Sequence, residues 1–173
     1  MRRISLLMLG VLLLAVPSFA QQKEPVPYIE LSGTYSYVRI ASTKTNYNGA
    51  SVSFALNPKP WLGIVGDIGG YHQAAPQGFE SNNLVTYLFG PRISYRTESR
   101  ITPFGQVLFG GVYSTMSGQT ALAMTAGGGF DLKMAPHVAI RLAQGEYFMT
   151  CFGSQTQNNI RISTGLVFRF GGE

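Results

Sequence analysis

Charged residues and cysteine are scarce in this chain. Lys, Arg, Asp and Glu make up 12% of its 173 residues, about half of the roughly 25% that is usual for soluble domains. The one cysteine, Cys151, has no partner for an intramolecular disulfide, and no Cys/His spacing typical of a metal site occurs. Beyond residue 20 no apolar run approaches the roughly 18 residues that a membrane helix needs. A disulfide scaffold and a helical membrane protein are therefore excluded, and we expect no cofactor.

Apolar residues, aromatics and glycine are abundant. Hydrophobic residues make up 45% of the chain, aromatics 12%, and there are 21 glycines. This composition is typical of a membrane barrel or of an unusually apolar soluble β-protein. Without Arg2 and Arg3 the chain has 13 − 2 = 11 basic and 8 acidic residues, a net charge of +3, which does not indicate a nucleic-acid partner.

The first 20 residues have the pattern of a secretory signal peptide. Two arginines precede an apolar run from Ile4 to Val16, which is too short to span a bilayer, and small residues follow at Ser18 and Ala20. We therefore predict cleavage after Ala20, an exposed lead-in over residues 21–27, and one domain over residues 28–171.

Alternating apolar and polar residues predict eight β-strands in that domain. The predicted strands are Tyr28–Ile40, Gly49–Leu56, Trp61–Tyr71, Leu84–Arg96, Ile101–Ser114, Ala121–Met134, Val138–Thr150 and Asn159–Phe170. Short turns near residues 57, 97 and 135 alternate with longer polar loops at 41–48, 72–82, 115–120 and 151–158. An even strand number with short turns and longer loops is typical of an outer-membrane barrel. We predict an all-β, eight-stranded antiparallel up-and-down transmembrane barrel with short periplasmic turns and extracellular loops.

The charged residues of the predicted strands share one face, and the large aromatics lie on the other. The charged face carries Glu30, Asp67, Arg92, Arg96, Asp131, Lys133, Arg141, Arg161 and Arg169. A soluble barrel would place this face in water and the opposite face inside, but eight strands enclose too little room for so many rings. We therefore predict that the charged face lines the lumen, where burial requires that the charges be paired.

The seventh predicted strand departs from this alternation. Gln144 and Glu146 fall on its apolar parity. A β-bulge near Ala143 would return both to the polar face, because a bulge adds one residue to one strand. With that bulge, Glu146 joins the lumen residues.

The last predicted strand ends in a polar residue, a glycine and two aromatics, at Ser163, Gly165, Phe168 and Phe170. This ending resembles the C-terminal signal that the barrel-assembly machinery reads in bacterial outer-membrane barrels. The tail at residues 171–173 is a departure, since many such barrels stop at the aromatic residue.

The domain as a whole resembles the OmpA/OmpX-type barrels of the outer-membrane β-barrel (porin-like) family. Three stretches carry the resemblance: GTYSYV at 33–38, GGGFDLKMAPHVAIR at 127–141 and TGLVFRFG at 164–171. The resemblance implies that Asp67, Arg92, Asp131 and Arg141 form a central ionic network that closes the lumen or gates it. It also implies contact with outer-membrane lipid. No segment matches that family's peptidoglycan-binding domain.

Three classes of function remain open. The first is a structural or surface-interaction barrel with a closed or gated lumen, the second a narrow porin-like channel, and the third an outer-membrane enzyme. Eight strands leave no open lumen, which disfavours the channel. The polar rim residues His72, Glu80, Ser114 and Ser117 do not form a catalytic set, so we expect no enzyme. The short polar loops do not favour a dedicated adhesin.

Overall fold

The computed structural model describes residues 26–40, 45–73, 81–97, 99–152 and 155–171. The predicted signal peptide, the cleavage site after Ala20 and most of the predicted lead-in lie outside these ranges. Within them the chain forms strands β1 Ile29–Ile40, β2 Thr45–Lys59, β3 Leu62–His72, β4 Asn83–Ser94, β5 Ile101–Ser114, β6 Gln119–Ala135, β7 Val138–Phe152 and β8 Gln155–Phe170.

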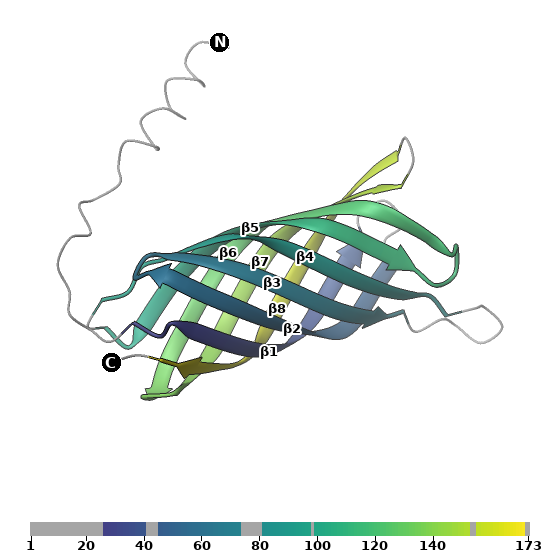
Figure 1. Ribbon diagram of the computed structural model, residues 1–173. Coiled ribbons are helices and arrows are strands. Elements are labelled where there is room, and N and C mark those ends of the chain that lie inside the picture. The colour runs from purple at the N-terminus through teal and green to yellow at the C-terminus, as the bar shows by residue number, and fades with distance from the viewer. Residues whose placement is uncertain (1–25, 41–44, 74–80, 98, 153–154, 172–173) are drawn as a thin grey trace, which may run out of the picture.

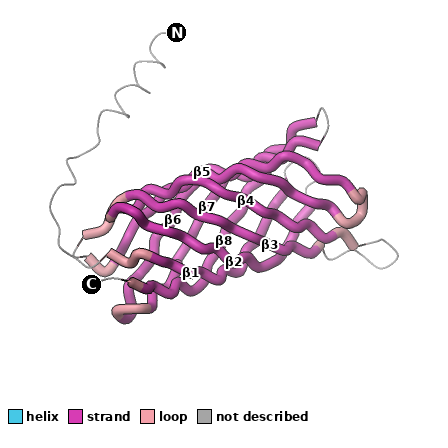
Figure 2. Tube along the Cα trace, viewed as in Figure 1, coloured by secondary structure: helices cyan, strands magenta, loops and turns pink. Residues whose placement is uncertain are grey.

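The strands form one closed barrel in which each pairs with its neighbours in chain order (Figures 1 and 2). Antiparallel pairing of β1 with β8 closes it, from Ile29 opposite Phe170 to Ile40 opposite Asn159. The predicted fold, an eight-stranded antiparallel up-and-down barrel, is confirmed. In the described ranges, no helix has the length and apolar character required to cross a membrane.

The two faces of the strands point as the alternation predicts. In β1, Glu30, Ser32 and Thr34 are buried while Leu31 and Tyr35 are exposed. The same alternation continues around the barrel, so that the large side chains on the outer wall are mostly apolar, for example Ile68, Phe89 and Leu122, which are 65%, 63% and 63% exposed. The interior therefore holds the polar face.

The outer wall has almost no charge. In the described strands, the only exposed Asp, Glu, Lys or Arg residues are Arg39, next to the last residue of β1, and Lys59, the last residue of β2. Aromatic side chains gather where the strands meet the short turns: Tyr28, Trp61, Tyr95 and Phe170 are all exposed there. Backbone hydrogen bonds join this end, from Tyr28 N to Gly171 O and from Ser94 N to the carbonyl oxygen of Trp61.

Several strands are longer than predicted. β2 begins at Thr45, and the predicted loop at 151–158 is mostly strand, because β7 continues to Phe152 and β8 begins at Gln155. Only residues 153–154 separate these two strands, and the hairpin projects from the barrel at the upper right of Figure 1. The predicted contrast between short turns and longer loops is therefore wrong for this connection. It also fails at the β4–β5 turn, residues 95–100, which is longer than the connections at 41–44 and 115–118. The polarity of residues such as Thr156 and Asn158 predicts a loop, but a hairpin beyond the apolar part of the wall tolerates polar residues on its outer face.

The predicted bulge in β7 is present. Arg141 pairs with Gly165 and Gln144 with Ser163, so that Leu142 and Ala143 together face a single residue, Thr164. The register with β6 shifts at the same point. Leu142 and Ala143 both face outward, while Gln144 and Glu146 are buried. The Thr164 hydroxyl donates to the backbone carbonyl of Arg141 at 2.9 Å, which explains the one polar residue on the apolar parity of β8.

The turn between β2 and β3 is tighter than predicted. β2 continues through Pro58 to Lys59, and its register with β3 shifts between Leu56 and Lys59. Since proline has no N–H to donate, the irregular pairing accommodates it.

The described interior is divided into a charged part and an apolar part, a division that the strand pattern does not predict. Buried apolar side chains from every strand except β8 form one cluster. The cluster reaches the loop ends of the strands and comprises Val38, Ile40, Tyr47, Ala55, Val65, Tyr71, Leu84, Leu88, Leu108, Val112, Ala121, Ala123 and Phe148. The charged residues concentrate at mid-height and toward the turns. The sequence pattern does not show this division, because the apolar residues at the inward-facing positions are scattered among serines and threonines.

Candidate functional site

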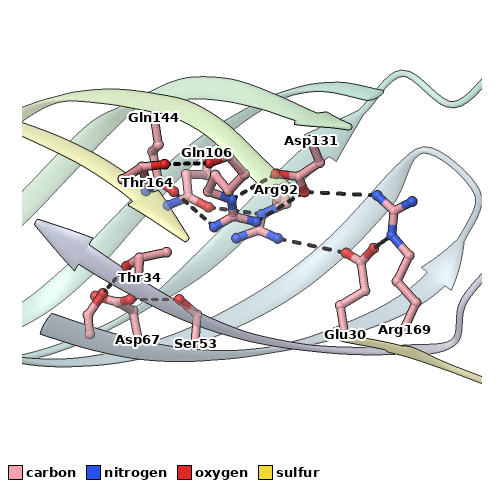
Figure 3. Close-up of polar contacts among 12 residues, drawn as sticks. Glu30, Thr34, Ser53, Asp67, Arg92, Gln106, Asp131, Gln144, Thr164 and Arg169 are labelled. Carbon is pink, nitrogen blue, oxygen red and sulfur yellow. Dashed lines mark hydrogen bonds and ion pairs between the residues drawn. The ribbon is translucent and has the colours of Figure 1, made fainter. Parts of the chain in front are cut away.

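The charged interior consists of five arginines and four carboxylates, all buried or nearly so. They are Arg92, Arg96, Arg141, Arg161 and Arg169 with Glu30, Asp67, Asp131 and Glu146. Figure 3 shows part of this cluster inside the barrel wall. Their alternating positions on the strands bring them inside, and the closure of the sheet brings together residues distant in sequence. We call this cluster the lumen network.

Arg161, on β8, joins two carboxylates from other strands. Its Nε donates to Glu146 Oε2 at 2.6 Å, and its Nη1 donates to Asp67 Oδ1 at 3.1 Å. The same Nη1 donates to the Tyr71 hydroxyl at 2.8 Å. The second oxygen of Asp67 accepts a 2.7 Å hydrogen bond from the Ser53 hydroxyl. Arg161 is 1% exposed and Asp67 4%, so this contact lies away from solvent.

Asp131 and Arg141 form a two-point ion pair. Arg141 Nε lies 2.9 Å from Asp131 Oδ1, and Nη2 lies 3.2 Å from Oδ2. The remaining Arg141 nitrogen, Nη1, donates to Gln144 Oε1 at 2.9 Å. Parallel hydrogen bonds of this kind are among the stronger polar contacts in proteins, because they fix the orientation of both groups.

Gln106 and Glu30 link these pairs into a continuous chain of contacts. Gln106 accepts from Arg92 Nε and donates to Glu146 Oε1, both at 2.9 Å. Glu30 contacts Arg169 at 3.0 Å and Arg96 at 3.2 Å, with Arg92 at 3.8 Å. The chain of contacts then runs in the order Asp67, Arg161, Glu146, Gln106, Arg92, Glu30, Arg169, Asp131, Arg141 and Gln144.

Phe104 lies between two of the arginines. The guanidinium carbons of Arg92 and Arg141 lie 4.8 and 4.5 Å from the centre of its ring. Gly129 makes room for the ring, since a Cβ there would lie 3.0 Å from the Phe104 ring and would collide with the Ala143 carbonyl. The ring faces of aromatic residues attract cations, so Phe104 holds two like charges side by side.

The four residues that the resemblance indicated share the interior but do not form a closed set of pairs. Only Asp131 and Arg141 bond directly. Asp67 bonds to Arg161, and Arg92 to Gln106. Of the other candidates, Glu30, Glu146, Arg161 and Arg169 are buried, Arg96 is 11% exposed in its side chain, and Lys133 is half-buried near the turn end of β6.

Sequence reasoning missed the roles of Phe104 and Tyr71. Phe104 shares the parity of Gln106, and three glycines on the neighbouring strand lie opposite residues 104–106. The signal that could have identified Phe104 is an aromatic residue at an inward-facing position, opposite glycines on the neighbouring strand.

The predicted assembly signal occupies the closing seam of the barrel. Ser163 is buried and its hydroxyl lies 2.8 Å from that of Ser36. Gly165 packs directly against β1, because a Cβ there would collide with the Gly33 carbonyl oxygen. Phe168 and Phe170 point outward, 40% and 48% exposed.

The described rim residues do not converge on a reaction centre. The His72 ring bonds to Asn83 Oδ1 at 2.7 Å, and the Ser114 hydroxyl donates to Asn82 Oδ1 at 3.1 Å. Ser117 is exposed, and Glu80 lies outside the described residues. Among the residues that the structure describes, no group of three or more His, Cys, Asp or Glu side chains could hold a metal ion.

Solved structures of several outer-membrane barrels have the same fold. Neisserial surface protein A matches with a TM-score of 0.64 at 14% identity, over 82% of this chain and 96% of that one. OprG of Pseudomonas aeruginosa matches with a TM-score of 0.61 at 9% identity, over 86% and 98%. The Yersinia pestis attachment invasion locus protein Ail, solved in complex with the heparin analogue sucrose octasulfate, matches with a TM-score of 0.51 at 14% identity, over 81% and 96%. No protein-family model matches the chain, and the curated proteins contain no significant match.

Proposed function

We propose that this protein is a small integral outer-membrane barrel with a closed polar lumen and a structural or surface-interaction role rather than a catalytic one. The observation that carries the proposal is the inverted distribution of polarity. Charged side chains lie inside the barrel and pair with one another. Large apolar side chains such as Ile68, Phe89 and Leu122 cover the outside.

This distribution fits a bilayer and not water. Soluble proteins rarely expose apolar patches larger than a few hundred Å². Here the apolar surface runs around the wall, and in the described strands charge interrupts it only near strand ends, at Arg39 and Lys59. A closed barrel also satisfies all backbone hydrogen bonds between strands, which a lipid environment requires. The aromatic residues at the turn end are placed as the interfacial girdle of such barrels.

The lumen network supports a closed rather than a conducting barrel. Arg92, Arg141 and Arg161 are at most 2% exposed, and their contacts cross the interior from β3 to β8. An eight-stranded barrel has an interior just wide enough for side chains to fill. A solute path would require several of these ion pairs to separate together. The alternative is a narrow channel, and measured ion conductance would favour it.

The location and assembly follow from the same proposal. An exported chain with the outer wall described above would meet the outer membrane, with its short turns on the periplasmic side and the connections after β1, β3, β5 and β7 outside. The seam formed by β1 and β8 carries Phe170, where we propose that the barrel-assembly machinery engages the chain.

Matched arginine substitutions on the outer wall test the membrane assignment. Ile68→Arg places a charge in the middle of the apolar wall, whereas Thr156→Arg places one on the exposed β8 end beyond it. In lipid, Ile68→Arg is expected to lower the free energy of unfolding by about 2–4 kcal/mol, and Thr156→Arg by much less. The measurement is urea unfolding of the mature chain, residues 21–173, refolded in vesicles. A chain that stays soluble and folded in plain buffer, with Ile68→Arg more soluble still, would contradict the proposal.

A further inference from the structure

A cavity lies inside the barrel at the end from which the connections after β1, β3, β5 and β7 leave. Its volume is about 390 Å³, which is toward the lower end of the range of 300–1,000 Å³ for small-molecule sites. Apolar side chains form much of its wall, chiefly Ile40, Leu84, Val112 and Phe148. These belong to the buried apolar cluster described above, so the cavity has a rigid floor made by strands.

Among the described residues that line the cavity, none has a charged side chain. On one side its polar groups already bond to one another. Asn82 Nδ2 donates to the Tyr47 hydroxyl at 3.1 Å, and Asn82 Oδ1 accepts from the Ser114 hydroxyl at 3.1 Å. Because an ion would lose its hydration here without gaining a counter-charge, the cavity favours an uncharged occupant.

Among the described residues of the cavity wall, Asn159 carries a buried side-chain acceptor that has no hydrogen-bond partner. Its residue is 1% exposed, and it pairs across the sheet with Ile40 on one side and Phe148 on the other. Its Nδ2 donates to the Thr150 hydroxyl at 3.5 Å, but its Oδ1 has no hydrogen-bond partner. A buried acceptor without a partner is costly, and native structures generally provide one.

We propose that this cavity binds a small uncharged molecule with an apolar body and one hydroxyl group, the simplest class being phenols. The hydroxyl donates to Asn159 Oδ1, while the body packs against Ile40, Val112 and Phe148. A hydroxyl both donates and accepts, so it also complements the neighbouring Thr150. The apolar wall and the buried free acceptor of Asn159 together select against ions, sugars and pure hydrocarbons.

The test is nuclear magnetic resonance on the folded mature chain in lipid nanodiscs, with para-ethylphenol as the probe. We expect saturable shifts of the Asn159 side-chain amide and of the Ile40 and Val112 methyl groups. Ethylbenzene, which lacks the hydroxyl, and para-ethylbenzoate, which is charged, are the comparison compounds and are expected to bind more weakly. Free aqueous concentrations are fixed by dialysis, because these compounds also enter lipid.

Two substitutions separate the site from general partitioning into the membrane. Asn159→Leu keeps the shape but removes the acceptor, and should weaken para-ethylphenol binding roughly three- to tenfold, the value of one neutral hydrogen bond, without weakening ethylbenzene. Val112→Phe fills the cavity and should abolish saturable binding, whereas Val85→Phe makes the same change on the exposed wall one strand away and should not.

Three results would overturn the proposal. They are the absence of saturable binding in the unsubstituted chain, equal affinity for para-ethylphenol and ethylbenzene, and an Asn159→Leu variant that binds the phenol unchanged. If Val112→Phe does not fold, the Asn159→Leu comparison alone decides, because that substitution fills no space.

Discussion

At the scale of single residues, the lumen network is stable because each buried charge has a partner. Arg161 illustrates this, since it satisfies both Glu146 and Asp67, which come from opposite sides of the barrel. Removing one member of a buried ion pair leaves the other charge without water and without a counter-charge, which is far more costly than the net value of the intact pair.

We therefore expect Arg161→Met to lower the free energy of unfolding by about 3–5 kcal/mol. The matched control is Arg39→Met, which removes the same group from the exposed outer wall and should have little effect. Urea unfolding in vesicles measures both. Adding Glu146→Gln to Arg161→Met should recover part of the loss, because it removes one of the two stranded charges. Equal stability of the two arginine variants would show that the network is not important for folding.

A second residue-scale prediction concerns Phe104. Phe104→Leu removes the ring from between Arg92 and Arg141 and should cost about 1–3 kcal/mol, the sum of lost packing and of two cation–π contacts of about 0.5–1 kcal/mol each. Phe109→Leu makes the same change on the exposed outer face of β5 and should cost less. If the Phe109 variant is the less stable in vesicle unfolding, the interior ring does not hold the arginines.

At the scale of elements, β7 keeps its faces correct only through the bulge. Residues before it, such as Arg141, and residues after it, such as Glu146, both reach the interior because Leu142 and Ala143 face Thr164 together. A strand of strict alternation would turn one of these charged groups toward the apolar outer wall, since a shift of one residue inverts every following side chain.

Deletion of Ala143 tests this role of the bulge. Without it, either Arg141 or Glu146 must leave the interior, and we expect the chain to lose its folded, heat-modifiable band in detergent. Deletion of Ser117, in the connection between β5 and β6, is the matched control and should leave that band in place. Normal folding of the Ala143 deletion would mean that β7 can re-register without cost.

The last element, β8, makes a prediction about assembly rather than stability. Phe170 is exposed and pairs with Ile29 at the seam, so its ring adds little to the packed interior. We expect Phe170→Ala to slow insertion by purified barrel-assembly machinery while leaving urea unfolding nearly unchanged. Phe130→Ala removes an equally exposed ring from β6 and should slow insertion less. Equal insertion rates for the two variants would remove Phe170 from the assembly signal.

At the scale of the whole molecule, the alternation of the sequence was sufficient to predict the fold. The parity of residues such as Glu30, Asp67 and Arg92 predicts which side chains are buried, and the misplaced Gln144 and Glu146 even indicate the bulge. This works because a barrel between lipid and a polar interior imposes a strict two-residue period on every strand.

The partners inside the barrel could not be predicted in the same way. Parity places Asp67 and Arg161 in the interior but does not say that they meet, because contacts across a barrel depend on the tilt and stagger of all eight strands. The apolar cluster near Leu84 and Phe148 was missed for a related reason. Its members come from seven strands, each of which contributes too few apolar residues to alter its own pattern.

Planar-bilayer conductance of the refolded mature chain tests the central claim most directly, after a heat-modifiable gel shift has shown that the sample is folded. A barrel sealed by the lumen network should insert without discrete current steps. The variant Arg161→Met, if it folds, should admit at most brief openings, since Arg92 and Arg141 still fill the interior. Steady, reproducible conductance steps from the unsubstituted chain would contradict a closed lumen and favour the channel.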